Sequence, residues 1–405
     1  MENKVVVTGY NIISSLGLNA DETWENLVQG KSGVGRITLF DASALQTQIA
    51  AQVPDAFENH ARERIKKRQA KQMTRVTQMA FVCTKDLIEK ENIDFDRFDK
   101  TRCAVILGVV NTGNSSVEKD NTAKNRIIKG MNNAMPAWIS MEYNLSGPSY
   151  SVATACASSA YAIAAAYDLI RVGKADLVIA GGADSTINPE EISGFNELYA
   201  LSVENESPEK ASKPFSKNRD GFVIGEGAGI MILESEASAN ARNATIYAEL
   251  AGYGLCSEAF NIMAPKADGE GMAQSMETAL QHAGIKKEEV DYISAHGTST
   301  TLNDRYEVMA IKKVFAGRAC EIPVSSQKSM IGHTVGAAGV IEGIVTIQSL
   351  LNQTLTPTIN LDEPDPELDL DFVPNKACKH PINVALSNSF AFGGHNATLV
   401  FRKRQ

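Results

Sequence analysis

The chain has 405 residues, of which 43% are hydrophobic and 21% are charged, and its formal net charge is −9 at pH 7. This length exceeds the ~250–300 residues that one hydrophobic core usually holds, so we expect two domains or two fused halves. The acidic balance argues against a general nucleic-acid-binding protein, and no apolar run approaches the ~18 residues of a membrane helix. The six cysteines are scattered without a CxxC pair, which predicts reduced thiols in the cytoplasm and neither disulfides nor a zinc site.

Strands and helices alternate in the first half of the chain. Apolar runs bounded by turn residues predict strands at Lys4–Thr8, Arg102–Gly108, Pro148–Val152, Leu177–Ala180 (closed by Gly181-Gly182) and Ile230–Leu233. Helical spacing and Gly stops predict helices at Asp21–Val28, Met73–Leu87, Pro136–Leu145 and Ala157–Leu169. The polar stretch Asn111–Thr122 is expected to be a loop.

The same alternation begins again near residue 246. The second block predicts strands at Ile246–Leu250, Tyr292–Ala295, Pro323–Ser325, Val384–Leu386 and Thr398–Phe401, with helices at Met272–Ala283, Glu307–Phe315 and within Ala337–Leu351. No linker rich in Pro, Gly or Ser separates the two blocks. The sequence therefore predicts a duplicated α/β architecture.

A basic segment stands out in this acidic chain. It contains Arg62, Arg64, Lys66, Lys67, Arg68, Lys71 and Arg75. Such a run is often a solvated helix face. It is also suited to docking an acidic partner, because charge steering raises the rate of association.

Cys156 lies between a predicted strand and an Ala-rich helix that is apolar on nearly every face, as in a buried helix. The unpaired N–H groups at the start of such a helix stabilise a thiolate and are expected to lower the pKa of Cys156 below the ~8.5 of a free cysteine. The alternative is a cysteine that packs as a small hydrophobic residue.

Two histidines occupy similar positions. His296 directly follows the predicted strand that ends at Ala295, and His333 lies at the next strand-to-helix junction. Open α/β sheets place their ligands at the carboxyl ends of strands, so the two histidines and Cys156 are candidates for one site. Gly393-Gly394 would bring backbone N–H groups close to a ligand, as an oxyanion hole requires, or would form a turn between two strands.

These windows together resemble one family. The resemblance rests on Thr154-Ala155-Cys156-Ala157-Ser158-Ser159, Arg219-Asp220-Gly221-Phe222-Val223, Gly225-Glu226-Gly227, His296-Gly297-Thr298-Ser299-Thr300, Lys328-Ser329-Met330, Gly332-His333, Gly336-Ala337-Ala338-Gly339, Asn388-Ser389-Phe390 and Phe392-Gly393-Gly394. In this order they resemble the β-ketoacyl-(acyl carrier protein) synthases of the thiolase superfamily, most closely the elongating type II branch. The resemblance implies a five-layer α-β-α-β-α fold of two similar halves, residues 1–245 and 246–405.

The resemblance also implies a role for each site residue. Cys156 would carry the acyl group, His296 and His333 would stabilise the enolate formed from malonyl-carrier protein, and Lys328, paired with Glu307, would order the histidine region. The backbone N–H groups of Cys156 and Phe392 would form the oxyanion hole, Thr298 and Thr300 would bind the phosphopantetheine arm, Phe390 and Phe392 would gate the acyl pocket, and Arg68 and Lys71 would dock the carrier protein. No metal or resident cofactor is implied, because the phosphopantetheine arrives on the carrier protein.

Some residues depart from the family pattern. Asn111 lies where the family lines the far end of the acyl pocket, and a polar group there disfavours a saturated fatty acyl chain. Ala391 stands where Gly is common, and Thr301 where Pro is common. The fatty acid and the type II polyketide or aryl-polyene pathways therefore stay open, as do a homodimer and a heterodimer with a chain-length-factor subunit. A partner subunit that shapes the pocket without condensing is the alternative function, although the intact cysteine and histidines speak against it.

Overall fold

The computed structural model describes residues 3–111 and 127–404, so most of the predicted loop 111–122 lies outside the described residues. Its centre is a mixed sheet of ten strands in the order β10-β9-β13-β14-β8-β1-β7-β6-β4-β5. The strands of this sheet are β1 (Val5–Ile13), β4 (Cys103–Gly108), β5 (Ser149–Val152), β6 (Leu177–Ser185), β7 (Glu226–Ser235), β8 (Ala248–Ser257), β9 (Tyr292–Ser294), β10 (Val324–Ser325), β13 (Val384–Ala391) and β14 (His395–Arg402). Two short antiparallel pairs join β2 (Gly35–Arg36) to β3 (Ile49–Ala50) and β11 (Thr354–Leu355) to β12 (Cys378–Lys379).

The large sheet consists of two groups of five strands with the same internal order. In each group the third strand along the chain lies at the outer edge, followed by the second, fourth, fifth and first. The second strand pairs parallel with the third and the fourth, and the fifth pairs antiparallel with its neighbours. Among the described residues, two residue pairs between β1 and β8 join the groups. This repeated topology confirms the predicted α/β class with two similar halves.

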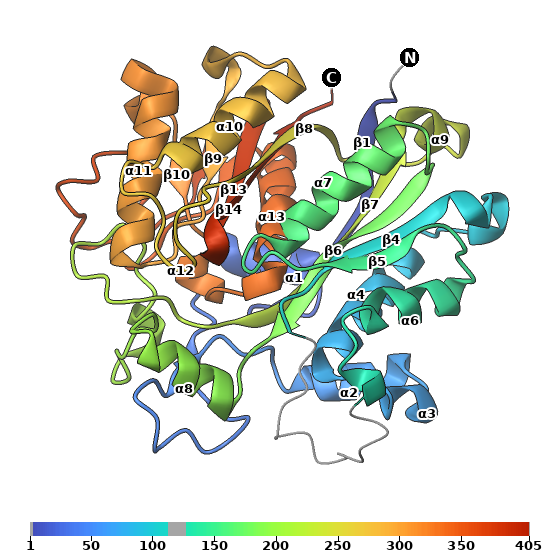
Figure 1. Ribbon diagram of the computed structural model, residues 1–405, viewed down its shortest axis with the longest axis horizontal. Helices are drawn as coiled ribbons and strands as arrows, with labels where there is room; N and C mark the ends of the chain where they lie inside the picture. The colour runs from blue at the N-terminus through green and yellow to red at the C-terminus, as the bar shows by residue number, and fades with distance from the viewer. Residues whose placement is uncertain (1–2, 112–126, 405) are drawn as a thin grey trace.

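Helices form three layers around and between the two strand groups. The helices are α1 (Ala20–Val28), α2 (Ala56–Arg64), α3 (Lys67–Ala70), α4 (Arg75–Lys90), α6 (Ala134–Tyr143), α7 (Ser158–Arg171), α8 (Pro189–Glu197), α9 (Glu236–Ala241), α10 (Glu270–Ala283), α11 (Thr301–Phe315), α12 (Lys328–Ile331) and α13 (Ala338–Asn352). Helices α7 and α13 pack on each other and form the layer between the two strand groups (Figure 1). Helices α4 and α6 cover the outer face of the first strand group. Helix α10 covers the outer face of the second strand group, with α11 packed beside it. The predicted boundary at residues 245–246 falls between α9 and β8, and its status as a domain boundary stays a prediction.

The central layer depends on small and apolar residues. The 18-residue segment Val335–Asn352 is long and apolar enough to cross a membrane, so the expectation that no run approaches this length was wrong. Yet 89% of it is buried inside the protein, because α13 packs against α7 and against strands of both groups. It is therefore a core helix.

Several predicted boundaries also differ from the structure: β1, β7, β8, β13 and β14 extend beyond the predicted ranges, and β6 and α11 differ as well. Strand β6 does not end at Gly181-Gly182 but continues to Ser185, and α11 begins at Thr301, before the predicted start at Glu307. The glycines of β6 reflect close packing: a Cβ at Gly181 would lie 2.1 Å from the carbonyl oxygen of Gly229 on β7. This close contact with β7, and not a turn, explains the glycines of β6.

Candidate active site

Cys156 lies in a tight turn between β5 and the buried helix α7. Ala155, directly before it, has φ +48°, a left-handed conformation that non-glycine residues rarely adopt. The hydroxyl of Ser158 holds this turn, because it accepts from the Thr154 N–H at 2.8 Å and donates to the Ala155 carbonyl at 2.7 Å. A Cβ at Gly108 would lie 2.3 Å from the Ser159 nitrogen, so glycine at the end of β4 lets the helix start against the sheet. Cys156 is thereby fixed at the sheet's carboxyl edge.

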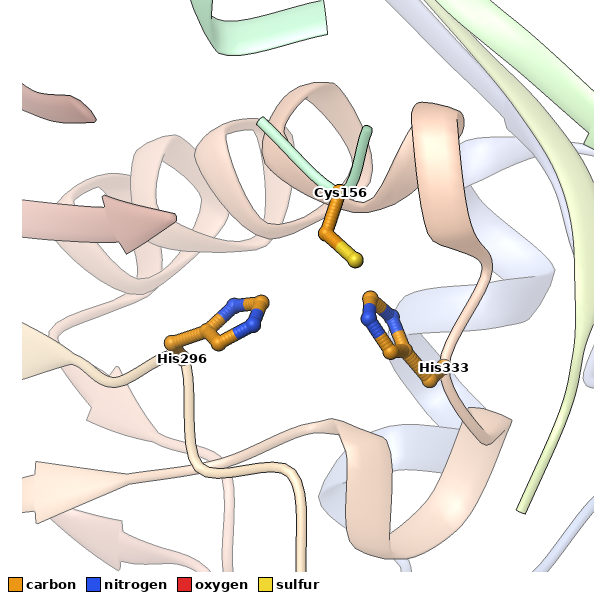
Figure 2. A group of neighbouring side chains, drawn as sticks. All are labelled: Cys156, His296 and His333. Atoms are coloured by element: carbon orange, nitrogen blue, oxygen red, sulfur yellow. The ribbon is translucent and has the colours of Figure 1, made fainter. Parts of the chain in front are cut away.

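The second half of the chain supplies both histidines. His296 follows β9, His333 follows α12, and the Cys156 side chain points between the two imidazole rings (Figure 2). The sulfur and one ring nitrogen of each histidine lie within 4.8 Å of one another. All three residues are buried. The structure thus brings together the three groups that the sequence placed at three separate junctions.

The hydrogen bonds of each histidine determine which of its nitrogens carries the proton. The Val335 N–H donates to His333 Nδ1 at 3.3 Å, and the Lys328 ammonium lies 3.3 Å from His296 Nδ1. An ammonium can only donate, so both Nδ1 atoms are acceptors and both Nε2 atoms carry hydrogen. The cluster therefore presents two N–H donors. This tautomer opposes zinc binding through Nε2, which would need a free lone pair there.

Burial keeps both histidines neutral. The pKa of His296 lies well below 6.5 because of burial and, to a lesser degree, the charges of Lys328 and His333. The pKa of His333 is lowered in the same direction by burial and by Lys328. At neutral pH both rings are therefore uncharged hydrogen-bond donors, not imidazolium ions.

The predicted low pKa of Cys156 was wrong. Burial raises the pKa of its thiol to about 12, against the smaller lowering effects of the Lys328 charge and of the backbone N–H groups of Cys156 and Phe392. Desolvation disfavours the charged thiolate more strongly than these groups stabilise it. Both N–H groups nevertheless lie within hydrogen-bonding reach of the sulfur, and an oxyanion hole would need them to face the oxygen of an acyl group bound there.

Lys328 pairs with Glu342 of α13 and not, as predicted, with Glu307. Its ammonium donates to Glu342 Oε1, and both side chains are 1% exposed. Glu307 instead accepts the backbone N–H groups of His296 and Gly297, each at 2.8 Å. Glu307 therefore holds the turn at His296 by accepting backbone N–H groups of that turn. Burial raises the pKa of the carboxyl groups of Glu307 and Glu342 to about 7.

A cavity of about 380 Å³ leads from the surface to these groups. Its lining includes the buried Cys156, His296, His333, Thr298 and Phe390 and the partly or largely exposed Leu198, Tyr199, Met263, Thr300, Leu302 and Phe392. The hydroxyls of Thr298 and Thr300 lie 2.8 Å apart in its wall. Ala391 also lines it and has φ −124°, a conformation that alanine adopts freely, so glycine is not needed there.

Three predicted site residues lie elsewhere. Asn111 does not line the cavity, and its amide donates to Glu191 Oε1 at 2.9 Å. Arg68 of α3 and the adjacent Lys71 are exposed and likewise not part of the cavity wall. A role for these residues in chain-length selection or docking stays a prediction.

Two buried carboxylates near the site were not singled out from the sequence. Glu342 is the one charged residue in the apolar stretch 337–351, and a lone charge in such a stretch signals a buried partner. Asp184, at the carboxyl end of β6, is 0% exposed and accepts three backbone N–H groups. Its position at a strand's carboxyl end was the available signal.

Two fused α/β halves, with a cysteine from one and two histidines from the other, define a condensing enzyme of thiolase-like fold. The chain belongs to the β-ketoacyl synthase family: residues 2–239 match the model of the β-ketoacyl synthase N-terminal domain, and residues 247–362 that of the C-terminal domain. The chain is 39% identical to the 3-oxoacyl-(acyl-carrier-protein) synthase 2 of Synechocystis sp., over 100% of this chain and 99% of that protein. It is 40% identical to the protein of the same name from Coxiella burnetii, over 99% of each.

Solved structures give the same result. A type II polyketide synthase ketosynthase, in complex with its acyl carrier protein and bound to the hexaketide, matches with a TM-score of 0.90 and 32% identity, covering 100% of both chains. The ishigamide ketosynthase/chain length factor matches with a TM-score of 0.92 and 31% identity, again over 100% of both chains. The predicted thiolase-like fold and family are therefore confirmed.

Proposed function

We propose that the protein is a β-ketoacyl-(acyl carrier protein) synthase, which joins an acyl group held on Cys156 to the two-carbon unit of malonyl-carrier protein with loss of CO2. The observation that carries this proposal is the convergence of one thiol and two neutral imidazole N–H donors at the inner end of a single cavity. A partner subunit that does not condense would need none of these three groups.

The first half-reaction moves the acyl group. The Cys156 sulfur attacks the thioester carbonyl of acyl-carrier protein, the carrier leaves as its thiol, and the proton of Cys156 ends on that thiol. The negative oxygen of the tetrahedral intermediate is stabilised by the N–H groups of Cys156 and Phe392. Because the resting thiol has a raised pKa, deprotonation accompanies attack instead of preceding it.

The second half-reaction forms the new carbon–carbon bond. The Nε2–H groups of His296 and His333 donate to the thioester oxygen of malonyl-carrier protein, so the negative charge left when CO2 departs is held as an enolate. The enolate carbon attacks the acyl-Cys156 carbonyl, and the Cys156–acyl bond breaks. The sulfur leaves as a thiolate that takes up a proton from solvent to restore the resting thiol, and a 3-oxoacyl chain longer by two carbons leaves on the carrier. The neutral state of both histidines supports this donor role.

The variant Cys156→Gln separates the two half-reactions. It has no nucleophile and should not condense, but it keeps both histidines and should decarboxylate malonyl-carrier protein at least as fast as the wild type. His333→Asn is the matched variant: it should accept an acyl group and lose decarboxylation. Loss of decarboxylation in Cys156→Gln would refute the assigned roles.

The partner we propose is an acyl carrier protein, which brings the phosphopantetheine so that the enzyme holds no cofactor of its own. The arm would enter between exposed Tyr199 and Leu302 and pass Thr298 and Thr300. The ketosynthase solved with its carrier protein supports this partner. Reversing the charges of Arg68 and Lys71 to Glu should raise the KM for carrier protein, and an unchanged KM would leave the basic segment a solvated face.

A dimer formed across the sheet edge completes the proposed assembly. Strand β5 ends the ten-stranded sheet, and its Tyr150 is 38% exposed. An uncovered edge strand favours pairing with a second chain. The partner is a second copy or a chain-length-factor subunit, and we place the protein in the cytoplasm because all six cysteines are free thiols.

Intact-protein mass spectrometry after incubation with acyl- and malonyl-carrier protein is the deciding experiment. An acyl adduct on Cys156 together with a carrier-bound product longer by two carbons, from this chain alone, would establish a self-sufficient synthase and favour the fatty acid pathway. An adduct without elongation would point to a missing partner subunit and to the polyketide type of pathway. Absence of any adduct on Cys156 would refute the proposal.

A further inference from the structure

The turn that fixes the His333 tautomer has an unfavourable backbone conformation. Val335, whose N–H donates to His333 Nδ1, has φ +46°. A β-branched residue is a true outlier in this region, and such a conformation persists only where the surrounding structure holds it. If Val335 relaxed to a negative φ, its N–H would turn and the hydrogen bond to Nδ1 would be lost.

A buried carboxylate contacts the residue that directly follows this turn. Asp184 Oδ2 accepts the N–H of Gly336 at 3.1 Å and the N–H of Val110 at 3.2 Å, while Oδ1 accepts the N–H of Ser185 at 2.9 Å. The approach is close, because a Cβ at Gly336 would lie only 2.7 Å from Asp184 Oδ2. Val110 and Val335 both line the cavity.

We propose that Asp184 is a positioning residue, which holds the turn at Gly336 so that Val335 keeps its left-handed conformation and His333 presents Nε2–H to the substrate. The expected effect of Asp184 on the rate of decarboxylation rests on the proposed synthase function. Its structural consequence, the tautomer of His333, does not depend on that function.

The chemistry of the site requires a carboxylate at this position. Burial raises the pKa of Asp184 to about 7, although the N–H groups of Gly336, Val110 and Ser185 lower it, so the variants are compared above pH 7, where the charged form predominates. Hydrogen bonds to a charged acceptor are about twice as strong as neutral ones, and here both oxygens accept N–H groups. An asparagine of the same shape offers one acceptor oxygen and one NH2 donor. With its NH2 at the Oδ2 position, the asparagine removes the acceptor of the Gly336 and Val110 N–H groups. In the other orientation it keeps these two hydrogen bonds on a neutral and therefore weaker acceptor, and it leaves the Ser185 N–H without one.

Asp184→Asn is therefore the variant to test, with Glu234→Gln as the matched control. Glu234 is also a 0% exposed carboxylate, but it lies at the far end of β7, opposite Leu177, where it pairs with Arg242. In Asp184→Asn, kcat for malonyl decarboxylation should fall about 10- to 100-fold with KM unchanged, from the loss of a charged hydrogen bond. Acylation of Cys156 should stay within about twofold of the wild type.

Glu234→Gln should lower the melting temperature and leave the ratio of decarboxylation to acylation unchanged. Equal loss of the two half-reactions in Asp184→Asn, or loss of neither, would overturn the proposal. A changed ratio of decarboxylation to acylation in Glu234→Gln would overturn the proposal as well, because the unequal loss of the two half-reactions would then reflect general destabilisation.

Glycine at position 335 provides a rescue. Glycine adopts positive φ without a steric cost, so Asp184→Asn/Val335→Gly should decarboxylate faster than Asp184→Asn alone. No recovery would show that the strained turn is not what Asp184 holds.

The tautomer itself is visible in 15N spectra of histidine-labelled protein, with His333→Asn used to assign the signal. The wild type should show His333 protonated at Nε2, and Asp184→Asn a mixture of the two tautomers. An unchanged tautomer would overturn the proposal even if decarboxylation fell. If the wild type failed to decarboxylate, the proposed function would fall while this measurement still tested Asp184.

Discussion

The buried pair of Lys328 and Glu342 predicts an unequal response to the loss of either partner. Both side chains are 1% exposed, so Glu342→Gln leaves an ammonium in the core without its countercharge, which costs about 3–5 kcal/mol of unfolding free energy. Lys328→Met leaves Glu342, whose pKa is already raised to about 7 by burial. This carboxyl can take up a proton at pH 7, so the cost is the lost hydrogen bond, about 1–3 kcal/mol.

Replacing both partners should restore stability without restoring activity. The double variant Lys328→Met/Glu342→Gln should be more stable than Glu342→Gln, because no charge is left unpaired. It should still decarboxylate slowly, since His296 Nδ1 has lost its donor. Urea unfolding and a CO2-release assay on the three variants measure the two effects. Recovery of activity together with stability would refute the role of Lys328 at His296, and equal costs for the two single variants would refute the argument from burial.

Three further predictions concern the state of the site. His333 is neutral in the folded protein because its pKa is lowered, whereas in the unfolded chain it takes up a proton below about pH 6.5. The free energy of unfolding of the wild type, relative to that of His333→Asn, should therefore fall by up to about 1.4 kcal/mol per pH unit below pH 6.5 in urea titrations. A difference that does not change with pH would contradict a lowered pKa of His333. Alkylation of Cys156 by iodoacetamide, followed by peptide mass spectrometry, should rise about tenfold per pH unit from pH 7 to 10 because the thiol is neutral there, and a plateau below pH 9 would show a lower pKa. Arg219→Lys should raise the KM for malonyl-carrier protein several-fold with a smaller effect on kcat in steady-state assays, because the buried guanidinium donates to the carbonyls of Thr300 and Thr301 and a lysine lacks this fork. An unchanged KM would assign Arg219 to stability alone.

The reactive groups could be found from the sequence because their positions follow from local rules. Cys156 and His296 each follow a predicted strand, and open α/β sheets place ligands at the carboxyl ends of strands, which made both residues candidates. The expectation of a strand-to-helix junction at His333 was less accurate, because helix α12 lies between β10 and this residue. The three groups meet because the two halves pack together, since β5 and β9 lie near opposite ends of the strand order. The duplicated topology could also be predicted from local patterns, because apolar runs and helical spacing show two blocks of alternating strands and helices.

The remaining features depend on contacts between distant segments. The family resemblance implied Glu307 as the partner of Lys328. The fold instead places Glu342 there, and Glu307 accepts backbone N–H groups. The pKa of Cys156 is set by burial in the folded chain, among apolar residues distant in sequence, and this burial outweighs the effect of the helix terminus. The left-handed Val335 has no signal in the sequence, because valine is a residue that such a conformation disfavours.

The seam between the two strand groups consists of two residue pairs, whereas the nucleophile and the two hydrogen-bond donors come from opposite sides of it. Their spacing is therefore set in the central layer, where the Val340 N–H donates to Ser159 Oγ at 3.0 Å and a Cβ at Gly339 would lie 2.9 Å from Ala160. This close contact limits how far α13 can lie from α7. A larger side chain at position 339 would push α13 away from α7 and so move the two histidines relative to the thiol.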